Sequence, residues 1–210
     1  MTIKELTHVH VFQPGDAGKA PLLLLHGTGG DERDLLPLGR VLSPGSPLLS
    51  PRGKVLEHGM TRFFRRLAMG VFDQEDLRQR TQELADFVRD AKDVYGFDGA
   101  RLTATGYSNG ANIAAAMLLL RPEALHAAAL FRPMVPFEPE AVPDLSGKRI
   151  FIGAARRDEY SSEEQTRRLA ELLESGGAEV EVHWVGGGHA LTQADVDAAR
   201  EWFATSSSAR

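Results

Sequence analysis

The chain has 210 residues, of which 42% are hydrophobic and 25% are charged, and this composition suits one globular domain around a single core. The net charge of -5, with lysines and arginines scattered among acidic residues, excludes a continuous basic surface and so excludes nucleic acid as a partner. The chain contains no cysteine, which excludes disulfides, thiolate metal ligands and a cysteine nucleophile. We therefore expect any nucleophile to be an oxygen or a nitrogen.

No segment of the sequence is suited to a membrane. The first ten residues lack the apolar core of a signal peptide, and the strongly apolar runs at 22–25 and 114–120 are far too short to span a bilayer. We therefore expect a cytoplasmic protein without a membrane partner. A homodimer is compatible with the sequence.

Apolar runs of strand length alternate along the chain with segments of helical period. We expect strands at residues 7–12, 21–26, 47–50, 101–106, 127–131, 149–155 and 180–185. We expect helices at residues 31–42, 73–95, 108–120, 161–175 and 192–204. From residue 21 onward most strands are apolar on both faces, as in a parallel sheet covered by helices on both sides. The pattern predicts an α/β fold, a doubly wound and mostly parallel sheet of about seven strands, with residues 7–12 as an antiparallel edge strand.

The clearest helix is the segment 73–95, which carries one apolar stripe, a capping residue in Asp73 and a stop signal in Gly96. No insertion elsewhere is long enough to form a separate cap domain. We therefore expect residues 1–210 to form one α/β domain, with a frayed tail at about 204–210.

A serine stands between two glycines where an expected strand meets an expected helix. The stretch GYSNG, residues 106–110, matches the pattern G-x-S-x-G, in which a serine is held on a sharp turn at the carboxyl edge of the sheet. Gly106 and Gly110 lack the Cβ atoms that would clash in such a turn. Composition alone would give roughly 0.1 matches in a chain of this kind. The motif and its position together predict Ser108 as a nucleophile.

The general base is expected to be a histidine late in the chain. His189 follows the last expected strand in a glycine-rich loop, which leaves the backbone free to bring its imidazole over Ser108. His183 alternates with strand residues and is expected on a sheet face. His8 and His10 share a face of the first strand and resemble a metal-binding pair, but no third ligand lies at a useful spacing.

A carboxylate between Ser108 and His189 is expected to orient the imidazole. Asp158 follows an apolar strand and therefore lies at the same edge of the sheet as the serine. Glu159 is its nearest competitor. Asp144 precedes that strand and so lies at the opposite end.

Two backbone N–H groups are expected to hold a developing oxyanion. One belongs to Asn109, the residue after the nucleophile, which lies at the positive end of a helix. The other is assigned to Thr28 in the glycine loop HGTGG, residues 26–30. A glycine loop after a strand can also bind phosphate, but this one lacks the Lys-Ser/Thr ending of a P-loop and the spacing of G-x-G-x-x-G.

Loops are expected to form the substrate pocket, chiefly the segment 52–72 with its aromatic and arginine side chains. The alternative is that these aromatics bury the segment against the core while its arginines face water. The residues assigned to the pocket are Gly27, Arg52, Phe63, Phe64, Phe72, Met134 and Val135.

Taken together, HGTGGDE, GYSNG, the region of Asp158 and GGGHALT resemble the α/β-hydrolase superfamily. More narrowly, they resemble the small carboxylesterase and phospholipase/carboxylesterase group, which includes acyl-protein thioesterase-like enzymes. The segment 51–77 closely resembles bacterial predicted esterases of that group. The resemblance covers about residues 8–203, and it implies a triad of Ser108, Asp158 and His189 that works without a metal or other cofactor.

The acyl-protein thioesterases usually read G-F-S-Q-G-G at the serine, whereas Asn109 and Ala111 stand in this chain. The expected function is a serine carboxylesterase that hydrolyses short-chain acyl or aryl esters, with a small-molecule ester as its partner. A thioesterase, lysophospholipase or peptidase with the same triad is the alternative among enzymes. A non-catalytic binding protein of the same fold is the alternative from another class.

Overall fold

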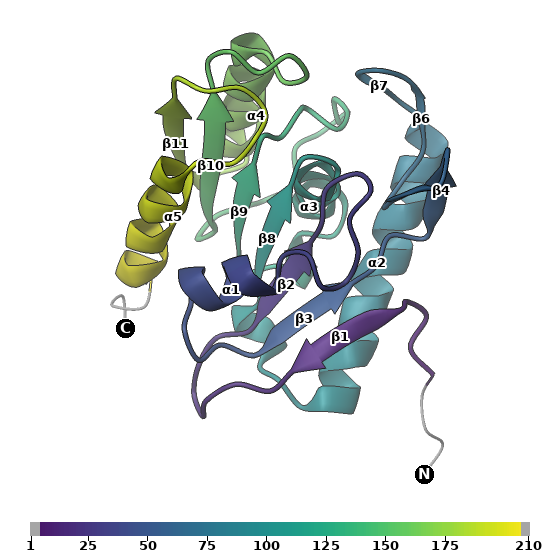
Figure 1. Cartoon of the computed structure of the whole chain (residues 1–210), viewed down its shortest axis with the longest axis vertical. Coiled ribbons are helices and arrows are strands. Elements are labelled where there is room, and N and C mark those ends of the chain that lie inside the picture. Colours follow the sequence, from purple (N-terminus) through teal and green to yellow (C-terminus); the bar gives the residue numbers. More distant parts are fainter. Residues whose placement is uncertain (1–4, 207–210) are drawn as a thin grey trace.

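The computed structural model describes residues 5–206, in which a central sheet is covered by helices on both faces (Figure 1). Its seven strands have the order β1-β3-β2-β8-β9-β10-β11. The strand β1 pairs antiparallel with β3 at one edge, and the other pairs are parallel. These strands are β1 (His10–Gln13), β2 (Leu22–Leu25), β3 (Leu48–Pro51), β8 (Thr103–Tyr107), β9 (Ala127–Phe131), β10 (Arg149–Ala155) and β11 (Glu179–Val185). The predicted α/β fold and its antiparallel edge strand are confirmed.

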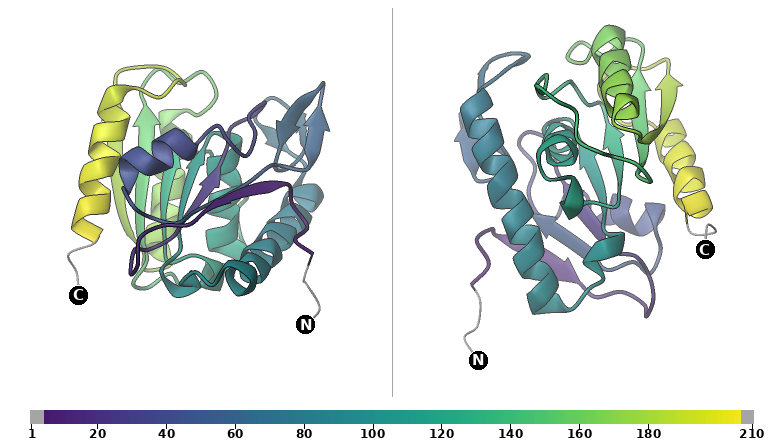
Figure 2. Two further views of the ribbon diagram at one scale, coloured as in Figure 1. Left: turned by 60° about the horizontal axis from the view of Figure 1, so that its bottom comes forward. Right: turned by 180° about the vertical axis from the view of Figure 1, so that it is seen from behind.

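Helices lie on both faces of the sheet (Figure 2). One face is covered by α1 (Leu36–Leu42) and α5 (Gln193–Ser206). The opposite face is covered by α2 (Gln74–Tyr95), α3 (Asn109–Leu120) and α4 (Glu163–Ser175). Single 3-10 turns occur at Gly99–Arg101 and Pro122–Ala124.

The run of four leucines in β2 explains why the strand is apolar on both faces. Leu23 and Leu25 pack in the core on the side of α2, α3 and α4, whereas Leu22 and Leu24 pack on the side of α1 and α5. Each of these side chains is buried. Full burial of one leucine stabilises the fold by about 1.5–3 kcal/mol relative to leaving it exposed, so this strand anchors both layers of helices to the sheet.

The ends of the helices follow local chemistry. At the start of α2, the side chain of Asp73 accepts a hydrogen bond from the N–H of Asp76, and the helix ends at Gly96 with a left-handed φ of 69°. The first helix is shorter than predicted, because residues 32–35 form turns and α1 begins one residue before Pro37. At the other end of the chain, α5 continues to residue 206, and residues 207–210 of the predicted frayed tail lie outside the described part.

Residues 55–72 form two short hairpins, which we call the arm, and this segment was predicted only as a loop. The strand β4 (Val55–Glu57) pairs with β5 (Met60–Arg62), and β6 (Arg66–Ala68) pairs with β7 (Val71–Phe72). Figure 1 shows the arm beside α2, at the edge of the molecule. Within residues 5–206, no helix combines the length and the apolar character needed to cross a bilayer.

A buried histidine near the start of the sheet makes stability depend on pH. The ring of His8 packs against Phe87 with centroids 4.7 Å apart. Burial, reinforced by the nearby charge of Lys54, lowers the pKa of His8 to about 3. The folded chain therefore keeps this imidazole neutral at a pH where the unfolded chain takes up a proton.

We expect the free energy of unfolding to fall as the pH drops from about 6.5 towards about 3, because the unfolded chain alone binds a proton at His8 in this range. The slope from this one group is at most about 1.4 kcal/mol per pH unit. Urea unfolding of the wild type and of His8→Gln at several pH values measures the effect. The wild type should lose stability relative to the variant as pH falls, and a difference that does not change with pH would contradict the prediction.

Candidate active site

The turn between β8 and α3 holds Ser108 in a strained conformation. Its φ of 53° and ψ of -114° lie in a region that side chains with a Cβ rarely adopt. The turn is so tight that a Cβ at Gly110 would lie only 1.9 Å from the carbonyl oxygen of Leu25. A Cβ at Gly106 would lie 2.5 Å from the carbonyl oxygen of Gly110. The two glycines of the motif thus allow α3 to start directly against the sheet, with the serine hydroxyl above it.

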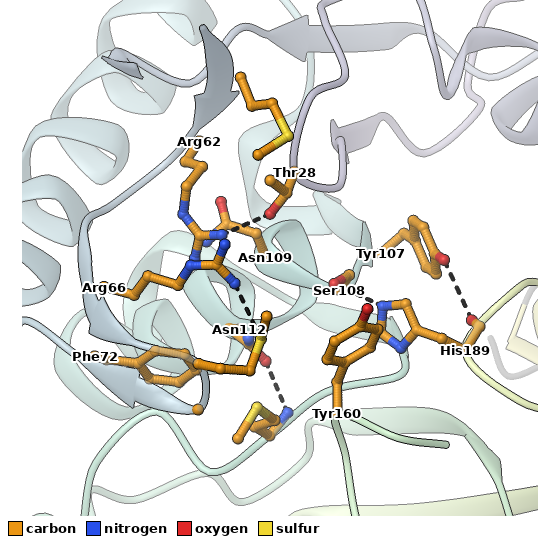
Figure 3. Close-up of a pocket in the computed structure, with 14 residues that line it drawn as sticks. Thr28, Arg62, Arg66, Phe72, Tyr107, Ser108, Asn109, Asn112, Tyr160 and His189 are labelled. Carbon is orange, nitrogen blue, oxygen red and sulfur yellow. Dashed lines mark hydrogen bonds between the residues drawn. The ribbon is translucent and has the colours of Figure 1, made fainter. Parts of the chain in front are cut away.

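The structure brings the three predicted side chains into one hydrogen-bonded row. The Oγ of Ser108 lies 2.9 Å from Nε2 of His189, and Nδ1 of His189 lies 2.9 and 3.0 Å from the carboxylate oxygens of Asp158 (Figure 3 shows the serine and the histidine). The side chain of Asp158 is fully buried. The N–H groups of Tyr160 and Ser161 also donate to its Oδ1, at 2.9 and 3.2 Å. The carboxylate is therefore fixed in place, and it favours the tautomer that leaves Nε2 free to accept the serine proton.

The competing acids lie elsewhere. Asp144 accepts a hydrogen bond from the N–H of Ser146 in a turn before β10, at the opposite end of that strand. Among the described residues, Asp158 and not Glu159 bonds to the imidazole of His189.

The other histidines considered have structural surroundings. His10 bonds through Nε2 to the hydroxyl of Tyr95 at 2.6 Å and through Nδ1 to the carbonyl of His8 at 2.7 Å. His183 lies on β11 with its ring near Phe151. In the part of the chain that the structure describes, no group of three or more His, Asp or Glu side chains could hold a metal ion.

The two backbone N–H groups predicted to hold an oxyanion belong to residues that line the pocket of Ser108. Among residues 5–206, neither the N–H of Thr28 nor that of Asn109 donates to a protein acceptor, and both residues border the same pocket as Ser108. The N–H of Asn109 belongs to the first turn of α3, where the helix dipole favours negative charge.

The loop that carries Thr28 is braced from two sides. From the arm, Arg62 donates to the Thr28 hydroxyl at 2.7 Å, and the carbonyl of Thr61 accepts from the N–H of Gly29 at 2.9 Å. His26 bonds through Nδ1 to the carbonyl of Gly27 at 2.7 Å, and its Nε2 accepts from a backbone N–H at 3.0 Å. Burial lowers the pKa of His26, so the neutral ring that these two bonds require is favoured.

A pocket of about 290 Å³ opens beside Ser108. Figure 3 shows the arm on one side of it and the loop of His189 on the other. Its polar border consists of Thr28, Arg62, Arg66, Asn109, Asn112 and His189, and its larger apolar or aromatic side chains are Met60, Met69, Phe72, Tyr107, Met134 and Tyr160.

The predicted pocket residues divide into two groups. Phe72 and Met134 line the pocket. The assignment of Phe63 and Phe64 was wrong, because both side chains are buried in the core on the side of α2 and α3 and fasten the arm to the body. The alternative of core burial holds for these two aromatics, and in part for Phe72, which is buried in the same cluster and also lines the pocket.

The other three assignments to the pocket were also wrong. Arg52 forms a bidentate ion pair with Glu32, at 2.5 and 2.8 Å, away from the pocket. Gly27 packs against the ring of Tyr107, where a Cβ would lie 2.9 Å from a ring carbon. Val135 packs against the core as Met134 does, but unlike Met134 it does not line the pocket.

Several pocket residues were missed by the sequence analysis. Asn112 lies one helical turn after Ser108, so the helical period alone places it on the same side of α3. Its Oδ1 accepts from the N–H of Met134 at 2.7 Å. Tyr160 lies two residues after Asp158 and packs edge-on against the ring of His189, with centroids 4.8 Å apart.

The arm places two guanidinium groups at the pocket, and both pair with Glu57, which does not line the pocket. Arg66 donates to Glu57 at 2.9 Å, and Arg62 lies 3.6 Å from the other oxygen of the same carboxylate. Burial and the neighbouring charge of Arg66 lower the pKa of Arg62. Because two cations share one anion, this wall of the pocket carries an excess of positive charge.

The sheet, the serine turn and the row of side chains are those of an α/β hydrolase, and residues 58–208 match the dienelactone hydrolase family. The chain therefore belongs to the dienelactone hydrolase family, within the predicted superfamily. It is 47% identical over 194 residues to MhqD of Bacillus subtilis (strain 168), a hydrolase by name, covering 92% of this chain and 96% of that protein.

Solved structures agree with this assignment. The Bacillus cereus carboxylesterase is 48% identical, with a TM-score of 0.93 over 95% of this chain and 94% of that one. The structure of YahD with malic acid is 34% identical, with a TM-score of 0.90 over 95% of this chain and 99% of that one. The chain is thus a hydrolase with carboxylesterases among its structural neighbours, as the motifs predicted.

The strain at Ser108 leads to a test of the turn itself. We expect Ser108→Gly to be more stable than Ser108→Ala, because glycine adopts a positive φ without the cost of about 1–3 kcal/mol that a Cβ brings there. Glycine also has an entropy cost of about 0.5–1 kcal/mol, which must be subtracted. The free energy of unfolding of the glycine variant should therefore exceed that of the alanine variant by about 1 kcal/mol. Denaturant unfolding of both variants measures it. An alanine variant as stable as the glycine variant would show that the turn is not strained.

Proposed function

We propose that the protein is a serine carboxylesterase that hydrolyses short-chain acyl or aryl esters through an acyl-enzyme. The observation that supports this most directly is the row of Ser108, His189 and Asp158 beside a pocket. The distance is 2.9 Å both from Oγ of Ser108 to Nε2 of His189 and from Nδ1 of His189 to Oδ2 of Asp158. A nucleophile bonded to a base that is itself oriented by a buried carboxylate is the arrangement that activates a serine hydroxyl.

In the proposed first step, Nε2 of His189 takes the proton of the Ser108 hydroxyl while Oγ forms a bond to the ester carbonyl carbon. The N–H groups of Thr28 and Asn109 hold the oxyanion that forms. The imidazolium then gives its proton to the alcohol oxygen, the bond between carbonyl carbon and that oxygen breaks, and the acyl group stays on the serine. Asp158 stabilises the imidazolium throughout.

In the second step, His189 takes a proton from a water molecule whose oxygen attacks the acyl carbon. The same N–H groups hold the second oxyanion, and the proton returns to Oγ of Ser108 as the carboxylic acid leaves. No other group is needed for the atoms and charges to balance.

The pocket limits the size of the acyl or alcohol group. Its volume of about 290 Å³ lies just below the range for small-molecule sites, about 300–1,000 Å³. Its walls combine methionine and aromatic side chains with a few polar groups. This supports short acyl or aryl esters as substrates.

We expect a fluorophosphonate to add once to the wild type, on Ser108, and not to Ser108→Ala, as measured by intact-protein and peptide mass spectrometry. The alanine variant should also lose turnover of p-nitrophenyl acetate by about 10⁴-fold or more, because nucleophile and base act as a unit. Circular dichroism of the variant controls for folding. A wild type that stays unlabelled would instead indicate a binding protein, and faster turnover of an acyl-CoA or a peptide amide would favour the alternative enzymes.

The excess positive charge on the arm supports a further choice of substrate, namely esters that carry a carboxylate. Arg62 and Arg66 line the pocket, and within residues 5–206 they share a single carboxylate, that of Glu57, as counter-ion. The structure of YahD with malic acid, a compound with two carboxyl groups, is in agreement with this preference.

We expect Arg66→Gln to lower kcat/KM for p-nitrophenyl hemisuccinate by about tenfold and to leave p-nitrophenyl butyrate nearly unchanged. A hydrogen bond to a charged group contributes about 1.5–3 kcal/mol. Only the hemisuccinate has a carboxylate that can bond to Arg66, so only this ester loses that contribution in the variant. Arg65→Gln is the matched control, because Arg65 lies on the same arm but is exposed and pairs with Asp73. Equal losses for both esters would contradict an anion preference.

A further inference from the structure

A buried ion pair lies beneath the loop that carries the imidazole. Arg132 follows β9 with a left-handed φ of 55°, and its guanidinium makes two hydrogen bonds of 2.8 Å to the carboxylate of Asp195. Both side chains are fully buried. Asp195 also accepts from the N–H and the hydroxyl of Thr192, at 2.8 and 2.7 Å. Burial opposes ionisation of Asp195, but the hydrogen bonds from Arg132 and Thr192 outweigh it, and the pKa of this carboxyl is lowered.

The same guanidinium holds the backbone on both sides of the imidazole. Arg132 donates to the carbonyl of Gly188 at 3.3 Å and to the carbonyl of Ala190 at 3.1 Å. The hydroxyl of Tyr107 donates to the carbonyl of His189 itself at 3.2 Å. Three consecutive carbonyls are thus held by side chains from β8 and from the residue after β9. The imidazole is therefore carried by a backbone that cannot shift without breaking these three hydrogen bonds.

Phe131 and Pro133, on either side of Arg132, bond to the segments that carry Ser108 and Asp158. The carbonyl of Phe131 accepts from the N–H of Ser108 at 2.9 Å. The carbonyl of Pro133 accepts from the hydroxyl of Ser161, whose own N–H donates to Asp158. The turn 131–133 is therefore bonded to the segments of the serine, the acid and the histidine together.

We propose that Arg132 is a positioning residue, which sets the imidazole of His189 between serine and carboxylate by clamping the carbonyls of Gly188 and Ala190. This rests on the proposed function for its kinetic consequence. A buried ion pair is by itself weak evidence for stability, because the cost of desolvating both charges offsets much of their attraction. Apolar side chains could fill the same space, but they could not donate to two carbonyls while the pair with Asp195 fixes the guanidinium.

The main test is the double variant Arg132→Met with Asp195→Leu, which removes the clamp and leaves no unpaired buried charge. We expect it to fold, to lose about 10- to 100-fold in kcat for p-nitrophenyl acetate and to keep KM within about twofold, because small displacements of reacting groups are costly. Proton NMR supplies a readout that needs no substrate. The downfield signal of the proton between His189 and Asp158 should be broadened or lost in the variant.

A second variant keeps the proposal testable if the double variant fails to fold. Arg132→Lys retains a cation opposite Asp195, but an ammonium cannot reach both carboxylate oxygens and both carbonyls. It should show the same loss in kcat and in the downfield signal. Arg168→Met is the matched control, because Arg168 also forms a bidentate pair, with Glu138, at the surface of α4. It should keep the wild-type kcat and signal.

Wild-type kcat and an unchanged downfield signal in the double variant, or in Arg132→Lys, would overturn the proposal and leave the pair a purely structural one. A wild type without activity on any ester would refute the proposed function only. In that case the downfield signal still decides whether Arg132 positions the imidazole.

Discussion

The first turn of α3 lies directly against the sheet at Gly110. A Cβ at this position would lie 1.9 Å from the carbonyl oxygen of Leu25 in β2, so no other residue fits without moving the strand or the helix. This contact sets how far α3 reaches into the sheet, and with it the height of Ser108 above the carboxyl edge. The loops that carry Asp158 and His189 meet at Ser108, whose position this contact fixes.

Much of the fold and the row of site residues were predicted from sequence because their signals are local. Buried parallel strands read as short apolar runs, and β2 with its four leucines is the clearest of them. The serine motif, the glycine loop before His189 and the strand before Asp158 each mark the carboxyl end of a strand. In a parallel sheet all such ends meet at one edge, so the chain order of the elements brings these side chains together.

The arm and the pocket could not be predicted in the same way, because they depend on pairing over a few residues and on the direction of each side chain. The hairpin strands are two or three residues long, too short for a periodic pattern. Phe63 and Phe72 are aromatic residues of one segment and both are buried in the core, but only Phe72 also borders the pocket. The ion pair of Arg132 could not be predicted from local sequence, because its partner Asp195 lies 63 residues further along the chain.

The arm separates anchoring from recognition along a single short stretch of chain. Phe63 and Phe64 fasten it to the interior, whereas Met60 and Met69, from different hairpins, face the pocket and are partly open to water. Side chains at the hairpin tips can therefore be exchanged during evolution without disturbing the helix, sheet and loops that hold the reacting groups. Related proteins that descend from one ancestor can in this way differ in substrate specificity while they keep the same reacting residues.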